Sequence, residues 1–238
     1  MAENIRSALG RGLPEAGRFR AHDRLMAVAG GGPSLADTWH ELQGVVVAVN
    51  GSLGFLLERG LMPWACGVCD PNPHMADIVE PRAGVFYFVA SCCDPAVFDR
   101  LRGCDVVLWH LTGPAEPILA ERGGDWLAIG GGCTMGLRWL NLAHAMGFRK
   151  FHLHGLDSSF RGGATHAYPD RQDARDSQRL TVEGYPTRLN FLAQVSDFFK
   201  VMERFAQPDL DPIGVELFGD GLLQHLWRRR PEGAFSLC

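Results

Sequence analysis

Two glycine-rich turns stand where strand-like apolar runs give way to helix-like patterns. The first turn is AGGGPSL at residues 29–35, and the second is IGGGCTMG at residues 129–136. A strand that ends at glycines and continues as a helix presents backbone N–H groups at a helix N-terminus, where anions bind. Two such turns predict a ligand with phosphate groups, most simply a nucleotide. The predicted phosphate contacts are Gly30, Gly31, Gly32, Pro33, Ser34, Gly131, Gly132, Cys133 and Thr134.

Each turn also has a plainer interpretation, a tight connection in which glycine only provides backbone clearance. Neither turn matches the phosphate loop G-x-x-x-x-G-K-[ST] or the dinucleotide fingerprint G-x-G-x-x-G. Because the phosphate-loop lysine is missing, backbone amides and a metal ion are expected to neutralise the phosphates.

Four further polar residues are candidates for the chemistry. Asn50, Asp70 and Asp157 each follow a predicted strand. The two carboxylates could hold Mg²⁺ between phosphates or form turns, and Asn50 could contact a ligand or form an Asn-Gly turn. His166 lies in the polar stretch after Asp157, where it could act as a general base.

Strand-like and helix-like patterns alternate along the chain. Strands are predicted at residues 25–29, 45–49, 64–68, 85–90, 106–109, 127–129 and 151–156, with an edge strand at 215–218. This alternation predicts an α/β fold, a Rossmann-like three-layer domain with a mainly parallel sheet and helices on both faces. In such sheets ligands bind beyond the carboxyl ends of the strands.

The predicted organisation is an N-terminal helical appendage at 1–24 and a single domain at 25–238, with a polar loop or lid at 161–184. The alternating His152 and His154 are interpreted as core residues. Cys66-x-x-Cys69 and Cys92-Cys93 could suggest zinc or redox chemistry, but no second C-x-x-C pair exists and buried thiols are favoured.

Net charge and apolar content limit the classes of partner that are expected. The net charge of −4 provides no global attraction to nucleic acid or to an anionic membrane. No run approaches the ~20 apolar residues of a membrane span, and the first residues lack the apolar core of a signal peptide. A cytoplasmic protein without a membrane partner is expected, and homo-oligomer formation is left open.

Four groups of residues together resemble a known family. They are residues 29–35; Asn50 with Asp70-Pro71; residues 131–136 with LNLA at 140–143 and Gly147-Phe148; and LHGLD at 153–157 with THA at 165–167. The chain resembles the 6-hydroxymethylpterin diphosphokinase MptE-like family, which is related to motility accessory factors and, more distantly, to bacterial sialyltransferases. The resemblance runs from about Met26 to Thr187. Here Gly31 replaces a frequent asparagine, and Cys133 a frequent serine.

The resemblance implies a Mg²⁺-dependent diphosphotransferase. ATP would give its diphosphate to the hydroxymethyl group of 6-hydroxymethyl-7,8-dihydropterin and leave as AMP. Asp70 and Asp157 would hold Mg²⁺, and His166 and Asp157 would act in catalysis. Two alternatives stay open: a glycosyltransferase that uses a nucleotide-activated sugar such as a CMP-sugar, and a nucleotide-binding protein without catalysis.

Overall fold

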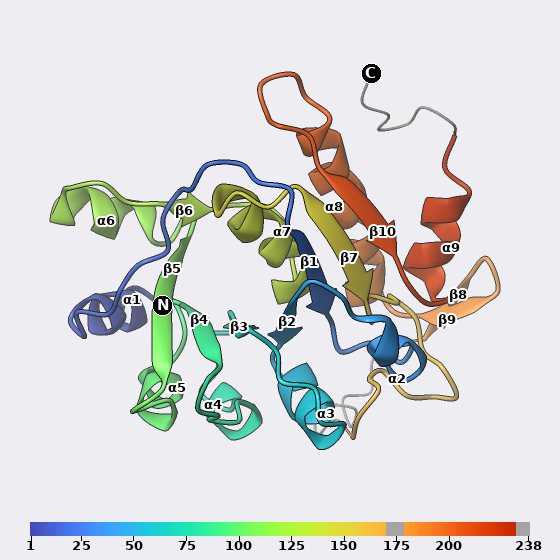
Figure 1. Cartoon of the computed structure of the whole chain (residues 1–238), viewed down its shortest axis with the longest axis horizontal. Helices are drawn as coiled ribbons and strands as arrows, with labels where there is room; N and C mark the ends of the chain where they lie inside the picture. The colour runs from blue at the N-terminus through green and yellow to red at the C-terminus, as the bar shows by residue number, and fades with distance from the viewer. Residues whose placement is uncertain (170–178, 232–238) are drawn as a thin grey trace.

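The predicted strands form one eight-stranded parallel sheet in the computed structural model, which describes residues 1–169 and 179–231 (Figure 1). The strand order is β10-β7-β1-β2-β3-β4-β5-β6. It reverses at β1, because the chain runs outward from β1 to β6 and then returns to the other side of β1. The strands are β1 (Leu25–Ala29), β2 (Val45–Val49), β3 (Ala65–Val68), β4 (Phe86–Ala90), β5 (Asp105–Leu111), β6 (Ala128–Ile129), β7 (Lys150–His154) and β10 (Gly214–Leu217).

Helices cover both faces of this sheet and make the three-layer α/β fold predicted from the alternation. They are α1 (Ala2–Leu9), α2 (Leu35–Thr38), α3 (Ser52–Glu58), α4 (Met75–Ile78), α5 (Pro95–Arg100), α6 (Glu116–Arg122), α7 (Met135–Ala145), α8 (Leu189–Phe205) and α9 (Leu222–Arg228). Within the described part of the chain, every helix is too short or too polar to cross a bilayer.

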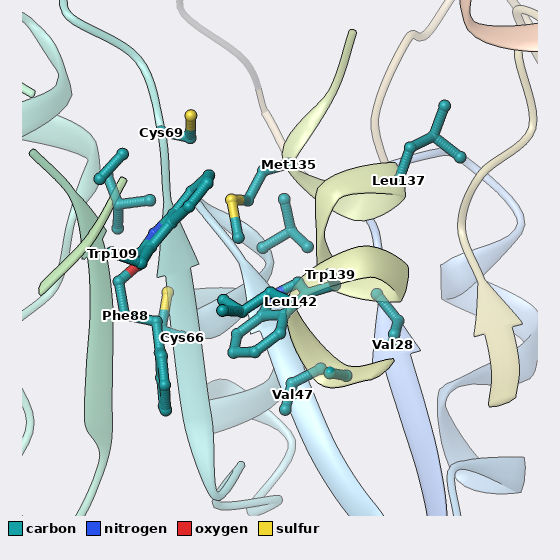
Figure 2. Close-up of a cluster of buried hydrophobic side chains, with 14 of the residues drawn as sticks. Val28, Val47, Cys66, Cys69, Phe88, Trp109, Met135, Leu137, Trp139 and Leu142 are labelled. Atoms are coloured by element: carbon teal, nitrogen blue, oxygen red, sulfur yellow. The ribbon is translucent and has the colours of Figure 1, made fainter. Parts of the chain in front are cut away.

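Helix α7 is anchored at the centre of the sheet by Trp139. This side chain is completely buried, its indole N–H donates to the carbonyl of Ala48 at 3.3 Å, and its ring lies 5.2 Å from that of Phe88 (Figure 2). Gly67 in β3 makes this packing possible, since a Cβ there would lie 2.5 Å from the indole nitrogen. The anchor fixes the start of α7 near the carboxyl ends of the central strands.

The first 24 residues contain helix α1, and this helix joins the common core. Ile5 and Ala8 are completely buried within it. Further along, Leu108 of β5 donates to the carbonyl of Pro14 and accepts from the N–H of Ala16, both at 2.8 Å. Residues 14–16 therefore run beside β5 as a short additional strand contact.

Strand β7 carries the two histidines that were interpreted as core residues. His154 is completely buried and stacks on Phe218 with ring centroids 4.2 Å apart. Burial lowers the pKa of His154 to about 4, so the ring is neutral at pH 7. His152 is half-buried. The cysteines 66, 69, 92 and 93 are buried thiols, as predicted.

The end of the polar stretch 161–184 forms the first strand of a hairpin that the sequence did not predict. Strand β8 (Leu180–Val182) pairs with β9 (Tyr185–Thr187) in an antiparallel two-stranded sheet. Residues 161–169 form an irregular segment after β7, and residues 170–178 of the predicted lid lie outside the described residues.

Candidate functional site

A cavity of about 490 Å³ lies beyond the carboxyl ends of β1, β2, β3 and β7. This is the edge at which ligands bind in open α/β sheets, next to the reversal of strand order. The predicted residues that line it are Gly30, Gly31, Gly32, Pro33, Asn50, Asp70, Thr134, Asp157 and His166. Further lining residues are Asp77, Gly155, Ser158, Ser159, Thr165, Tyr168, Arg188, Asn190, Phe191 and Gln194.

The first glycine turn does not offer its N–H groups to a phosphate in the way predicted. Gly30 donates to the carbonyl of His154 at 2.8 Å, and Gly32 donates to the carbonyl of Gly155 at 2.7 Å. Because β1 and β7 are neighbours, the turns that follow them are in direct contact. A Cβ on Gly30 would lie 2.5 Å from the carbonyl oxygen of Gly155. At Gly30 and Gly32 the glycines therefore fit a tight connection that needs room for the backbone better than they fit a phosphate site.

Ser34 and Asp157 complete this junction. The N–H of Ser34 donates to Asp157 Oδ2 at 2.9 Å. The hydroxyl of Ser34 is completely buried and does not line the cavity, so the predicted phosphate contact by Ser34 is wrong. Asp157 is 4% exposed, and burial raises the pKa of its carboxyl group. Its Oδ1 is buried without a hydrogen-bond partner among the described residues.

Two lining residues hold left-handed backbone conformations that are rare outside glycine. Asn50 has φ of 49° and Ser158 has φ of 53°. Such positions cost energy and cluster at functional sites. The side-chain oxygen of Asn50 is buried and has no partner in the described structure, which leaves an acceptor for a ligand at the end of β2.

The predicted metal ligands lie on different sides of the cavity. Asp70 follows β3 and accepts the N–H of Asn72 at 2.9 Å through Oδ1, whereas Asp157 follows β7. The described residues contain no group of three or more metal-ligating side chains. Asp77, which sequence reasoning missed, is a second carboxylate lining the cavity after β3. Mg²⁺ is commonly held by one or two carboxylates together with phosphates, so Asp70 and Asp77 fit this donor set.

His166 lies over the first glycine turn. The N–H of Ala167 donates to the carbonyl of Gly31 at 2.9 Å. A Cβ on Gly31 would lie 2.6 Å from His166 Cδ2 and 2.7 Å from the hydroxyl oxygen of Tyr168. His166 Nδ1 lies 2.9 Å from the hydroxyl of Thr165. The segment after β7 thus covers the turn after β1, and glycine at position 31 provides the space.

The second glycine turn is divided between two cavities, which corrects the prediction of a single phosphate cleft. Thr134 is the N-cap of α7 and lines the first cavity. Gly131 and Gly132 instead line a second cavity of about 660 Å³ near the ends of α7 and α8, and Cys133 is exposed. The glycines follow β6 at the sheet edge, so the chain reaches the central strands only at Thr134.

Three polar residues at the start of α8 were missed by sequence reasoning: Arg188, Asn190 and Gln194. Gln194 Nε2 donates to Thr134 Oγ1 at 3.4 Å, and the hydroxyl of Ser158 donates to Gln194 Oε1 at 3.2 Å. These bonds connect α8 with the start of α7 and with the turn after β7. The i, i+4 spacing of Asn190 and Gln194 was the available signal.

The parallel sheet and the polar cavity at its reversal point define a Rossmann-like α/β domain with a candidate site at its strand ends. The chain belongs to the 6-hydroxymethylpterin diphosphokinase MptE-like family, whose model matches residues 1–163. This confirms the resemblance, although the match starts and ends earlier than the expected range of about 26–187.

A solved structure supports the fold over nearly the whole chain. The MAf glycosyltransferase from Magnetospirillum magneticum AMB-1 is similar with a TM-score of 0.62 at 16% sequence identity. The similarity covers 92% of this chain and 38% of that chain. No curated protein sequence shows significant similarity to the chain.

Proposed function

We propose that this protein transfers a phosphorus-containing group from a nucleotide bound in the cavity at the ends of β1, β2, β3 and β7. One observation carries the proposal: three buried polar atoms on lining residues have no partner in the described structure. They are Asn50 Oδ1, Asp157 Oδ1 and Arg188 Nε. Buried polar groups are almost always hydrogen-bonded, so acceptors and a donor around one cavity indicate a polar ligand.

The reaction that the family supports is diphosphate transfer from ATP to the hydroxymethyl group of a reduced pterin. The acceptor hydroxyl oxygen forms a bond to the β-phosphorus, and the bond from that phosphorus to the α–β bridging oxygen breaks. AMP leaves with this oxygen. His166 accepts the hydroxyl proton, because it lines the cavity beside the turn after β1. Positioning and charge stabilisation supply most of the catalysis in such transfers.

Mg²⁺ would be held by Asp70 and Asp77, and Asp157 would line the opposite side of the cavity. When bound, the ion would neutralise phosphate charge. Thr134 and the start of α7 would face the phosphates, because an 11-residue helix directs the positive end of its dipole towards the cavity. Asn50 would accept a hydrogen bond from the nucleotide or the acceptor.

A second candidate is glycosyl transfer from a nucleotide-activated sugar such as a CMP-sugar. The observation in its favour is the solved MAf glycosyltransferase, whose fold matches 92% of this chain. In that reaction the sugar would leave the nucleotide for an acceptor hydroxyl, and His166 would again accept the proton.

The test is an assay of the purified protein with ATP, 6-hydroxymethyl-7,8-dihydropterin and Mg²⁺. We expect AMP and diphosphorylated pterin in equal amounts, and loss of both products on chelation. His166→Gln should lower turnover by about 10²–10⁴-fold, the usual contribution of a general base. His152→Gln, a change outside the cavity on β7, is the control.

Two other outcomes would redirect the assignment. Transfer from a CMP-sugar that persists with chelator would support glycosyl transfer instead. Nucleotide binding without turnover on either donor would indicate a binding protein and would overturn both reactions.

A further inference from the structure

Arg188 is a basic residue of the cavity that no sequence motif indicated. It is the N-cap of α8 and follows directly after β9. Among the described residues that line the cavity, it is the one arginine or lysine. It also lies beyond the segment that the family model matches.

The charge of Arg188 is not used within the described structure. Its Nε is buried without a partner, and no described carboxylate forms an ion pair with its guanidinium group. Arg161, by contrast, lies in the segment after β7 and is bound to both Asp37 and Asp220. Of these two arginines, Arg188 is therefore the one with charge available to a ligand.

Aromatic rings fix the plane of this guanidinium group. Its central carbon lies 4.3 Å from the ring centroid of Phe191 and 5.7 Å from that of Phe160. Stacking occupies the flat face of the group and leaves its N–H donors, which lie in the plane, free to bind an anion. A guanidinium held in this way is suited to bidentate binding of phosphate oxygens.

The surroundings of Arg188 also favour negative charge. Arg188 caps a 17-residue helix, and the Gln194–Thr134 hydrogen bond joins the start of that helix to the start of α7. Two helix N-termini thus meet at the cavity beside the arginine, and their dipoles act in the same sense as its charge. In the first glycine turn, by contrast, the N–H groups of Gly30 and Gly32 are already bonded to backbone carbonyls.

We propose that Arg188 binds a phosphate group of the nucleotide and so replaces the lysine of an ordinary phosphate loop. The inference rests on the proposed function for the presence of a nucleotide, but it does not depend on which group is transferred. The inference predicts that replacing the Arg188 side chain removes a phosphate contact and so lowers the affinity for a nucleotide.

The test compares Arg188→Gln and Arg188→Lys with the wild-type protein by calorimetry. The probes are adenosine, AMP, ATP, cytidine, CMP and inorganic pyrophosphate. For Arg188→Gln we expect about 10- to 100-fold weaker binding of a phosphorylated probe, as for loss of a charged hydrogen bond, and unchanged nucleoside binding. Arg188→Lys should retain part of the affinity for phosphorylated probes, because lysine keeps the positive charge but lacks the paired N–H donors of the guanidinium group.

Controls separate binding from folding. Arg102→Gln removes an exposed arginine that is paired with Asp99 and lines neither cavity, and it should leave all affinities unchanged. Thermal melting without ligand should show that both Arg188 variants fold, because the capping acceptor at this position is the backbone carbonyl. Loss of the stacking on Phe191 should lower the melting temperature of Arg188→Gln only slightly.

The outcomes distinguish this inference from the proposed function. Equal affinity of Arg188→Gln and wild type for every phosphorylated probe would overturn the role of Arg188 and leave the proposed function intact. Equal weakening of nucleosides and nucleotides would overturn it as well. If Arg188→Gln bound the phosphorylated probes more weakly but the wild-type protein transferred no diphosphate, the role of Arg188 would be supported and the proposed reaction would be overturned. A wild-type protein that binds none of the probes would overturn both.

Discussion

Asp157 joins two turns of the fold and also lines the cavity. Oδ2 accepts the N–H of Ser34 and joins the turns after β1 and β7, whereas Oδ1 has no partner among the described residues. Its carboxyl pKa is raised by burial, which means that the folded protein holds the proton more tightly than the unfolded chain does. The charge at neutral pH therefore costs stability, and a bound ligand offsets this cost if it contacts Oδ1.

Removal of the acceptor and removal of the charge at Asp157 should have different effects. Asp157→Ala leaves the buried N–H of Ser34 without a partner and should cost about 1–3 kcal/mol in the free energy of unfolding. Asp157→Asn keeps an acceptor oxygen and loses the buried charge, so it should be at least as stable as the wild type at pH 7. Urea denaturation measures both changes.

The pH dependence supplies the check on this explanation. The stability cost of the wild-type carboxylate grows as pH rises through and above 3.8, the ordinary value for the unfolded chain. Any advantage of Asp157→Asn should therefore shrink when the same measurement is made below that pH. Equal destabilisation by asparagine and alanine would show that the hydrogen bond to Ser34 does not explain the role of Asp157.

Which polar residues could be predicted depended on their neighbours in the sequence. Asn50, Asp70 and Asp157 each end a β-branched or apolar run, so their place at the strand ends follows from the parallel sheet alone. Arg188 could not be found in this way. It follows an unpredicted hairpin, and its neighbours Leu189 and Asn190 are exposed, which gives the sequence around it the character of a surface turn.

The three glycines of the first turn are required for different reasons. At Gly30 and Gly32 a Cβ would meet the carbonyl oxygen of Gly155 at 2.5 and 2.7 Å, and backbone cannot move aside cheaply. At Gly31 the obstructing atoms are the ends of the His166 and Tyr168 side chains. Substitutions at Gly30 or Gly32 should therefore disturb the contact between the turns after β1 and β7, whereas a substitution at Gly31 should disturb the segment that contains His166 and Tyr168.

Alanine substitutions in this turn should lower stability at two positions and activity at the third. Gly30→Ala and Gly32→Ala should each cost about 1–3 kcal/mol, as overpacking does. Gly31→Ala should fold with nearly wild-type stability but displace His166 and lower turnover. Thermal melting and the AMP assay measure the two effects. If Gly31→Ala melted as early as the other two variants, the side chains of His166 and Tyr168 would be as resistant to displacement as the backbone at Gly155.

The second glycine turn shows what strand-to-helix patterns omit. Both turns follow the same local rule, but β1 lies at the centre of the sheet and β6 at its edge. The order of strands depends on contacts between distant residues, and no local pattern reports it. Two turns with similar residues therefore reach different cavities, and only the last part of the second turn, from Thr134 onward, joins the first cavity.

The chain as a whole shares one core, and α1 takes part in it. Ile5 is completely buried, and Asn4 donates to the carbonyl of Cys92 at 3.0 Å. The boundary predicted at residue 24 came from a weak local pattern, since a short amphipathic helix does not reveal what it packs against. The alternation of strands and helices was a stronger signal, and all eight strands of the main sheet lie within two residues of their predicted bounds.

Truncation of Ile5 tests whether α1 stabilises the domain. Ile5→Ala should lower the free energy of unfolding by about 2–5 kcal/mol, as expected for a fully buried aliphatic residue. Ser7→Ala changes an exposed residue of the same helix and should leave the free energy nearly unchanged. Unfolding of both variants would be followed by circular dichroism. An Ile5→Ala protein as stable as Ser7→Ala would support a helix that is only appended to the domain.

The junction between β1 and β7 also sets the order of events in folding. Leu25 pairs with Lys150, and the hydrogen bond between Ser34 and Asp157 spans 123 residues. Parallel pairing over such separations is slow, because a long loop must close before the contact stabilises it. During synthesis, β1 to β6 leave the ribosome with one side of β1 still unpaired. The cavity cannot form before β7 fills that gap and α8 follows it, so a growing chain makes β1 to β6 before it acquires the candidate site.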